Sequence, residues 1–111
     1  MDESRAAVDR KSGGAAGVSP GITLLSTVVR GKDQLSADLR DEVVILALNS
    51  EEYYSLEAVG ARIWEIIAEP MTLNNILNLL LMEYDIDPVR CERDLLALVR
   101  KLADEGLIEV R

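Results

Sequence analysis

The sequence predicts an α+β domain in which a three-stranded antiparallel sheet is followed by three helices. Two observations carry this prediction. An unbroken apolar run at Val43–Leu46, bounded by turn residues, is too short for a free helix and indicates a buried strand. After residue 58, apolar residues recur at helical spacing in three separate stretches. At 111 residues, the chain has room for one such domain.

The central strand is expected to have a partner on each side. Gln34–Leu39 alternates loosely, and its separation from Val43 by Arg40–Asp41 suits a tight hairpin. Beyond a polar turn, Tyr53–Leu56 is the second hairpin partner. This strand is short and follows a charged turn, so we expect it at the edge of the sheet, with outer N–H and C=O groups that lack a partner. A β-branched stretch, Ile22–Arg30, is a further strand whose place in the sheet stays open.

The first helix is expected to end near Pro70. Its apolar stripe is widened by Trp64, which we interpret as a core anchor whose indole N–H finds one partner. Gly60 lies inside this helix at a cost of about 1 kcal/mol relative to alanine. Close approach of another backbone is the simplest explanation for that glycine.

Two more helices and a terminal strand follow. Thr72 is a suitable N-cap for the second helix, and Asp87 for the third. Pro88 takes the first position of the third helix, where its missing N–H costs nothing, and this helix runs to about Glu105. Leu107–Val110 then alternates like a terminal strand or wing. Three helices with a short turn between the last two, plus flanking strands, describe a winged helix-turn-helix arrangement.

Composition argues against several classes of function. The net charge of −8 repels phosphate groups, so nucleic acid is disfavoured as a partner. Histidine is absent, which removes the commonest general base and the commonest metal ligand. Acidic pairs such as Asp41 with Glu42 are interpreted as solvated turn charge. We therefore predict no catalytic residue, no metal and no cofactor.

Cysteine usage and hydropathy suggest a compartment. The one cysteine, Cys91, excludes an internal disulfide and is interpreted as a small buried hydrophobe. With no signal-peptide core and no long apolar run, the chain is expected to be cytoplasmic and not to cross a membrane. Met1–Ser19 mixes charge with small residues and has no apolar period, so we expect a disordered tail. The folded domain is then expected at residues 20–111.

The third helix carries more apolar surface than one core contact needs, because its apolar residues cover roughly half of the circumference. The middle of that arc is expected in the core, which leaves two rims. One rim consists of Cys91 and Leu98, bordered by Arg90, Asp94, Ala97 and Lys101. The other consists of Leu96 and Ala103, bordered by Arg93 and Arg100. Periodicity does not choose between the rims. A rim that faces the Tyr53–Leu56 edge would form a trough suited to strand addition by a peptide.

Five stretches together resemble the PqqD-like family of precursor-peptide recognition proteins: YYSL, then EAVGARIW, the YDIDP turn, the RDLLALV helix and the closing GLIEV. The resemblance covers about two-thirds of the chain. It implies a RiPP recognition element, a domain that binds the leader of a ribosomally made precursor peptide and delivers it to modifying enzymes. The sequence looks most like the free-standing leader-binding protein of lasso-peptide systems, which works beside a separate leader peptidase and a cyclase.

The resemblance also implies a site. In the family, the leader adds as an antiparallel strand to the third strand of the sheet and lies against the third helix. Asp94 matches the characteristic acidic position, which favours its rim. The peptide-binding residues predicted in this way are Tyr53, Tyr54, Ser55, Leu56, Arg90, Cys91, Asp94, Ala97, Leu98 and Lys101. The chain departs from the family pattern at Glu51, where many relatives have Gly, and at Glu57, where they have Asn.

Two other functions fit parts of the sequence. A winged-helix transcriptional regulator would place the third helix in the DNA major groove, but that helix carries four basic and four acidic residues from Arg90 to Glu105, and a DNA reader should show a basic face. A homodimer through the open edge would compete with peptide binding. We expect a monomer or a weak homodimer.

Overall fold

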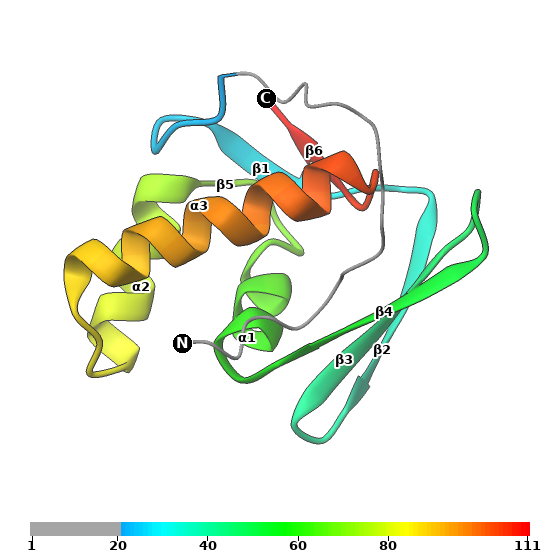
Figure 1. The fold of residues 1–111 in the computed structure, drawn as a ribbon, viewed down its shortest axis with the longest axis horizontal. Helices are drawn as coiled ribbons and strands as arrows, with labels where there is room; N and C mark the ends of the chain where they lie inside the picture. Colours follow the sequence, from blue (N-terminus) through cyan, green and yellow to red (C-terminus); the bar gives the residue numbers. More distant parts are fainter. Residues whose placement is uncertain (1–20) are drawn as a thin grey trace.

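The computed structural model describes residues 21–111 and has the predicted fold class, three antiparallel strands followed by three helices (Figure 1). The predicted tail Met1–Ser19 lies outside the described residues. The strands and helices in order are β1 Thr27–Arg30, β2 Gln34–Leu39, β3 Glu42–Ala47, β4 Glu52–Glu57, α1 Ala58–Ile66, β5 Met71–Thr72, α2 Leu73–Glu83, α3 Pro88–Asp104 and β6 Ile108–Val110.

One sheet consists of β2, β3 and β4, with β3 in the centre. Both hairpins are antiparallel, and Arg40–Asp41 forms the tight turn between β2 and β3, as predicted. Side chains alternate along β3, where Val43, Ile45 and Ala47 are buried against the helices. The opposite face of this sheet is called the open face. It carries Leu35, Ala37, Leu39, Glu42, Val44, Leu46, Tyr53, Ser55 and Glu57.

A second sheet, ordered β5-β1-β6, was not predicted as a separate unit. The expected strand Ile22–Arg30 is shorter than predicted, and it pairs with β5 and β6 instead of joining β2. The chain passes between the sheets at Gly31, whose backbone N–H donates to the Leu107 carbonyl at 2.8 Å. A Cβ atom at this position would lie 3.1 Å from that oxygen, so the close approach favours glycine.

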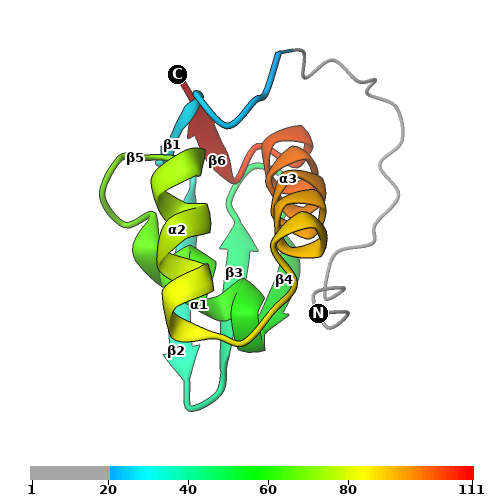
Figure 2. The same ribbon diagram turned by 90° about the vertical axis from the view of Figure 1, so that its left-hand side faces the viewer.

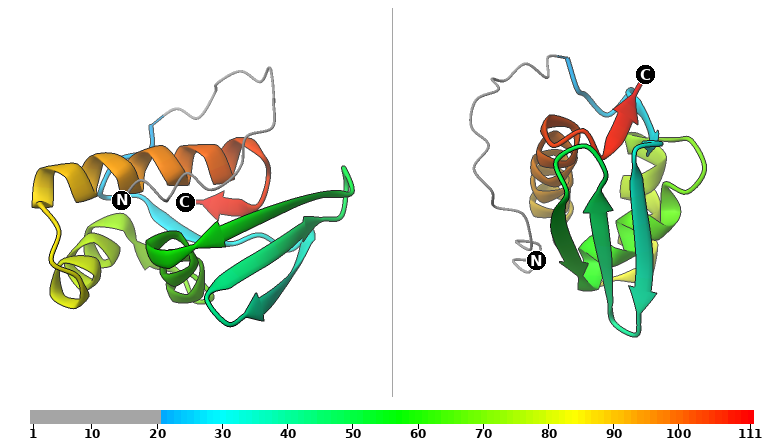
Figure 3. Two further views of the ribbon diagram at one scale, coloured as in Figure 1. Left: turned by 60° about the horizontal axis from the view of Figure 1, so that its bottom comes forward. Right: turned by 90° about the vertical axis from the view of Figure 1, so that its right-hand side faces the viewer.

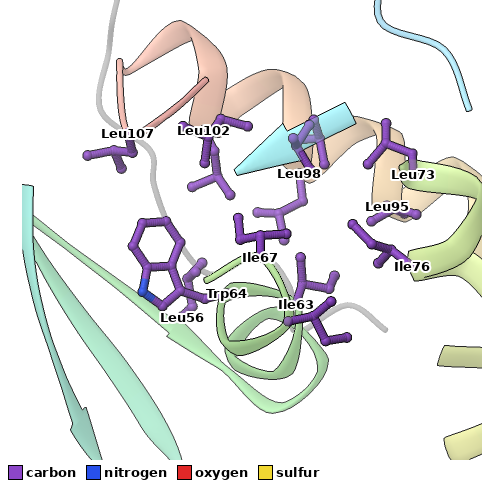
Figure 4. Close-up of a cluster of buried hydrophobic side chains, with 14 of the residues drawn as sticks. Leu56, Ile63, Trp64, Ile67, Leu73, Ile76, Leu95, Leu98, Leu102 and Leu107 are labelled. Atoms are coloured by element: carbon purple, nitrogen blue, oxygen red, sulfur yellow. The ribbon is translucent and has the colours of Figure 1, made fainter. Parts of the chain in front are cut away.

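The core lies where α1 meets the first sheet, α2 and α3 (Figures 2 and 4). Trp64 is fully buried, and its indole Nε1–H donates to the Ser36 hydroxyl at 3.2 Å, as predicted. The expectation for Gly60 is wrong. A Cβ there would meet side-chain atoms of Leu56 and Leu98 at 3.6 Å or more, which is ordinary contact rather than close approach of a backbone.

Helix boundaries follow the predicted caps. The Thr72 hydroxyl accepts from the backbone N–H of Asn75, and the Asp87 carboxylate accepts from that of Arg90. Within residues 21–111, no helix has the length and apolar character needed to cross a membrane.

Glu51, at the end of the β3–β4 turn, has a φ of 59°, in the left-handed region that favours glycine. Glu51→Gly is therefore expected to raise the free energy of unfolding by about 1 kcal/mol, because it relieves that strain. Urea unfolding measures the change. Ser50→Gly is the matched control, since Ser50 lies in the same turn without a positive φ. If both variants lose stability alike, the turn is not strained at Glu51.

Candidate peptide-binding site

Strand β4 is an edge of the first sheet, and among residues 21–111 no strand pairs with its outer side. The side chains of Tyr54 and Leu56 point into the core and are 5% and 0% exposed. Tyr53 is 71% exposed and, like Ser55, lies on the open face. The sequence left open which of the two tyrosines faces the core, and the structure assigns Tyr54 to that place.

The phase of the hydrogen-bond ladder determines which backbone groups of β4 point outward. The Leu48 N–H donates to the Asp33 carbonyl at 3.0 Å, just beyond the last residue pair of β2 and β3. Hydrogen-bonded and non-bonded pairs alternate in an antiparallel ladder. The backbone N–H and C=O groups of every second residue, from Leu48 back to Glu42, therefore point towards β2. Their partners in β4 then have N–H and C=O groups directed away from β3. These partners are Tyr53, Ser55 and Glu57.

Helix α3 lies on the β4 side of the first sheet, not on the β2 side (Figures 2 and 3). Its C-terminal end is tied to β4, because the Tyr54 hydroxyl donates to Glu105 Oε1 at 2.7 Å. Further along, Leu98 of α3 and Leu56 of β4 both pack around Gly60. The helix therefore runs antiparallel to β4, with its C-terminal end beside Tyr54.

This contact shows which rim of α3 faces the strand. Glu105 follows Leu98 by seven residues and Cys91 by fourteen, so the three lie on one side of the helix. The rim of Cys91 and Leu98 therefore faces β4, and Asp94 and Lys101 border it. The sequence predicted Glu105 only as the end of the third helix. Its heptad spacing from Cys91 and Leu98 could have placed it on the side of the helix that faces β4.

The ten predicted residues gather along β4 and this rim, but not all of them are accessible. Cys91 and Leu98 are 0% and 6% exposed, so neither side chain is open to solvent, and Cys91 is the small buried hydrophobe that the sequence predicted. Their side chains fill the core beneath α3. Burial, with a contribution from Asp94, raises the pKa of the Cys91 thiol. This thiol is therefore protonated at neutral pH, as a buried hydrophobe would be.

The accessible part of the rim is polar. Arg90, Ala97 and Lys101 are exposed, and the Asp94 side chain is 25% exposed. An Asp94 carboxylate oxygen lies 3.8 Å from Arg90 Nε, and the other lies 3.9 Å from Arg93 Nε. The wall that α3 presents beside β4 thus carries charged side chains and the small residue Ala97, and the apolar side chains of the rim, Cys91 and Leu98, lie beneath it.

Comparison with known proteins shows to which family this chain belongs. The family described as coenzyme PQQ synthesis protein D (PqqD) matches residues 42–108, which span β3, β4 and all three helices. The chain belongs to the PqqD family. A solved structure, TbiB1 in complex with the TbiA(beta) leader peptide, is 37% identical to this PqqD chain, with a TM-score of 0.69. The match covers 73% of this chain and 94% of the TbiB1 chain. The search of curated proteins found no match to the present chain.

In this PqqD-family chain, a hollow that the sequence did not indicate adjoins the end of β4. Its volume is about 760 Å³, and it lies between the β2–β3 turn, the start of α1 and Tyr84. It is lined by five acidic residues and two arginines. One of these, Arg62, is already held by Glu83 through two contacts of 2.8 Å. None of the ten predicted residues lines the hollow. Among residues 21–111, no group of three or more acidic or cysteine side chains is placed to hold a metal ion.

Tyr54→Phe tests the link between β4 and α3. Burial and the Glu105 carboxylate raise the pKa of Tyr54 above its ordinary value. Below pH 10 the hydroxyl is protonated in both the folded and the unfolded chain, so its stabilising contribution is complete there. As the pH rises above about 10, the unfolded chain ionises first and stability falls. Tyr54→Phe is expected to cost about 1–2 kcal/mol at pH 8, and to flatten this alkaline loss.

Urea unfolding of the wild type and Tyr54→Phe at pH 8 and pH 10.5 measures both effects. Tyr53→Phe is the control, because Tyr53 is exposed. Equal alkaline slopes for the wild type and Tyr54→Phe would show that the Glu105 contact does not tie α3 to β4.

Proposed function

We propose that this chain is a non-catalytic recognition domain. It binds the leader segment of a ribosomally synthesised precursor peptide, in a lasso-peptide system, and delivers it to a leader peptidase and other modifying enzymes in the cytoplasm. The leader adds as an antiparallel strand to β4 and lies against α3. The backbone of Tyr53, Ser55 and Glu57 supplies the hydrogen bonds.

The observation that carries this proposal is the free edge of β4 beside α3 in a chain 37% identical to a protein solved with a leader peptide. An edge with outward N–H and C=O groups binds another strand through the main chain, whatever the peptide sequence. Selection among peptides then depends on side chains at the rim. Because the leader adds antiparallel to β4, the N-terminal end of the added strand lies next to Glu57 and its C-terminal end next to Glu52.

The rim residues set the register of the leader. Asp94 is partly exposed and Lys101 is exposed, and they lie one helical turn on either side of Leu98. Charged groups at such a rim contribute specificity more than affinity, because water competes for them. Ala97 leaves room for a leader side chain to approach the helix. Tyr53, on the open face, is available to the alternate side chains of the added strand.

Binding to DNA through α3 is the less favoured alternative. From Arg90 to Glu105, the four basic residues are balanced by four acidic ones, and Asp94 lies within 4 Å of Arg90 and Arg93. A helix that reads the major groove needs an uncompensated basic face. The net charge of −8 adds to the repulsion.

Titration of a fluorescently labelled leader, taken from the precursor encoded beside this chain, tests the proposal by anisotropy. Saturable binding is expected. Asp94→Ala should weaken it by about three- to tenfold through loss of a charged contact at the rim. Glu92→Ala is the matched control, because residues two apart lie on opposite sides of a helix. Absence of binding, or equal affinities of the two variants, contradicts the assigned rim.

A further inference from the structure

The hollow at the end of β4 is large enough to hold part of a peptide. Its volume of about 760 Å³ falls within the range of small-molecule sites, about 300–1,000 Å³. The β2–β3 turn forms one wall and the start of α1 forms the other, and the two lie near each other in Figure 3 (left). On the α1 wall, Ala58 and Ala61 present only methyl groups, which leaves room for a long side chain.

The hollow has an excess of negative charge. Five carboxylates and two guanidinium groups line it, which gives a net charge of −3. Arg62 is held by Glu83 at 2.8 Å and by Glu65 at 3.1 Å, so its charge is already compensated. The other four carboxylates of the lining form no ion pair with any residue from 21 to 111, and the hollow therefore attracts a further positive charge. They are Asp38, Asp41, Glu42 and Glu57.

Two of these carboxylates face each other across the sheet. The strand register pairs Glu42 of β3 with Glu57 of β4. Like charges directly opposite each other in an antiparallel pair destabilise a sheet. Glu57 does not offset this cost by capping α1, because its side chain accepts no hydrogen bond from the start of that helix. A cationic group bound beside the pair would relieve the repulsion.

The hollow is continuous with the edge to which the leader adds. Glu57 belongs to both, because its backbone points outward from β4 and it also lines the hollow. The N-terminal end of the added strand lies next to Glu57, and beyond this residue the chain turns into α1, so the leader has no further strand to pair with. Neighbouring strands are about 4.8 Å apart and an extended residue spans about 3.4 Å, so about three residues carry the leader across the end of β4 to the β2–β3 turn.

We propose that the hollow is a subsite for a lysine or arginine side chain of the leader, located within about three residues N-terminal to the strand that adds to β4. This inference rests on the proposed function. Backbone hydrogen bonds alone permit a strand to shift by two residues along its partner, because the pattern repeats with that period. The basic side chain in the hollow fixes one register. A leader without it binds more weakly and in more than one register.

A double-mutant cycle between the full-length chain and the leader encoded beside it tests the subsite by anisotropy at low ionic strength. The chain variant is Glu42→Gln/Glu57→Gln. In the leader variant, each lysine and arginine N-terminal to the added strand is replaced by glutamine, after N-methylation of successive amides has located that strand. The leader substitution is expected to weaken binding to the wild type about three- to tenfold, and to have no effect on binding to the glutamine variant. Glu69→Gln/Glu92→Gln is the matched control, because it removes two negative charges outside the hollow.

Separate results distinguish the ways in which the inference can fail. If the leader does not bind at all, the proposed function and this inference both fail. If the leader binds but has no basic residue in this stretch, or if its substitution weakens binding equally for the wild type and the glutamine variant, the inference alone fails. Urea unfolding should show that Glu42→Gln/Glu57→Gln is at least as stable as the wild type, because it removes a repulsion. A loss of stability would assign the two carboxylates to the fold and overturn the inference.

Discussion

Replacing Ser55 by proline is expected to weaken leader binding at least about 100-fold and to leave the domain folded. The Ser55 N–H points away from β3, so proline removes no hydrogen bond from the sheet. It does remove a donor to the added strand, and its ring occupies the space that the strand would take. An unmade backbone bond together with this displacement costs about 3 kcal/mol of binding free energy. Anisotropy titration measures the loss, and circular dichroism checks the fold.

Asp38→Pro provides the matched control on the other edge of the same sheet. The residues on either side of Asp38 form the hydrogen bonds between β2 and β3, so the Asp38 N–H points outward, as the Ser55 N–H does. Strand β2 is the edge of the sheet that lies away from α3. Leader affinity should be unchanged in this variant. A loss equal to that of Ser55→Pro would mean that proline acts through the stability of the sheet.

The leader itself offers a second test that cannot disturb the fold of the chain. N-methylation of successive leader amides should weaken binding at every second position and spare the positions between, because alternate amides of an added strand face β4. A pattern without this period of two would contradict strand addition.

Leu98→Ala is expected to lower the free energy of unfolding by about 2–5 kcal/mol, the range for a buried leucine replaced by alanine. Leu98 is 6% exposed and packs with Leu56 around Gly60, at the point where α3 meets β4 and α1. The truncation leaves a cavity under the wall of the proposed site. Urea unfolding measures the loss.

Val89→Ala is the control on the same helix, because Val89 is 73% exposed. Its stability should stay within about 0.5 kcal/mol of the wild type. If Leu98→Ala costs less than 1 kcal/mol, Leu98 is not a core residue, and its side chain returns to the list of residues that contact the leader.

Local chemistry in the sequence determined most of the elements. The apolar run of β3, the tight turn at Arg40–Asp41, and the caps Thr72 and Asp87 each depend on neighbours in the chain. Local patterns of this kind can be recognised in the sequence without knowledge of the fold. The burial of Trp64 with one partner was equally predictable, because a large aromatic with one polar group has few alternatives.

Contacts between residues distant in the sequence were settled only by the tertiary structure. Pairing of β1 with β6 joins the two ends of the described chain. The contact of Tyr54 with Glu105 chooses the rim of α3 that faces β4, and the position of α1 buries Leu98 beneath it. Helical periodicity gives the angle of a side chain about its own axis, but not the direction in which that axis is docked. Roughly half of the circumference of α3 is apolar, so several orientations of the helix against the rest of the domain would bury enough apolar surface. The tertiary contacts decide among them.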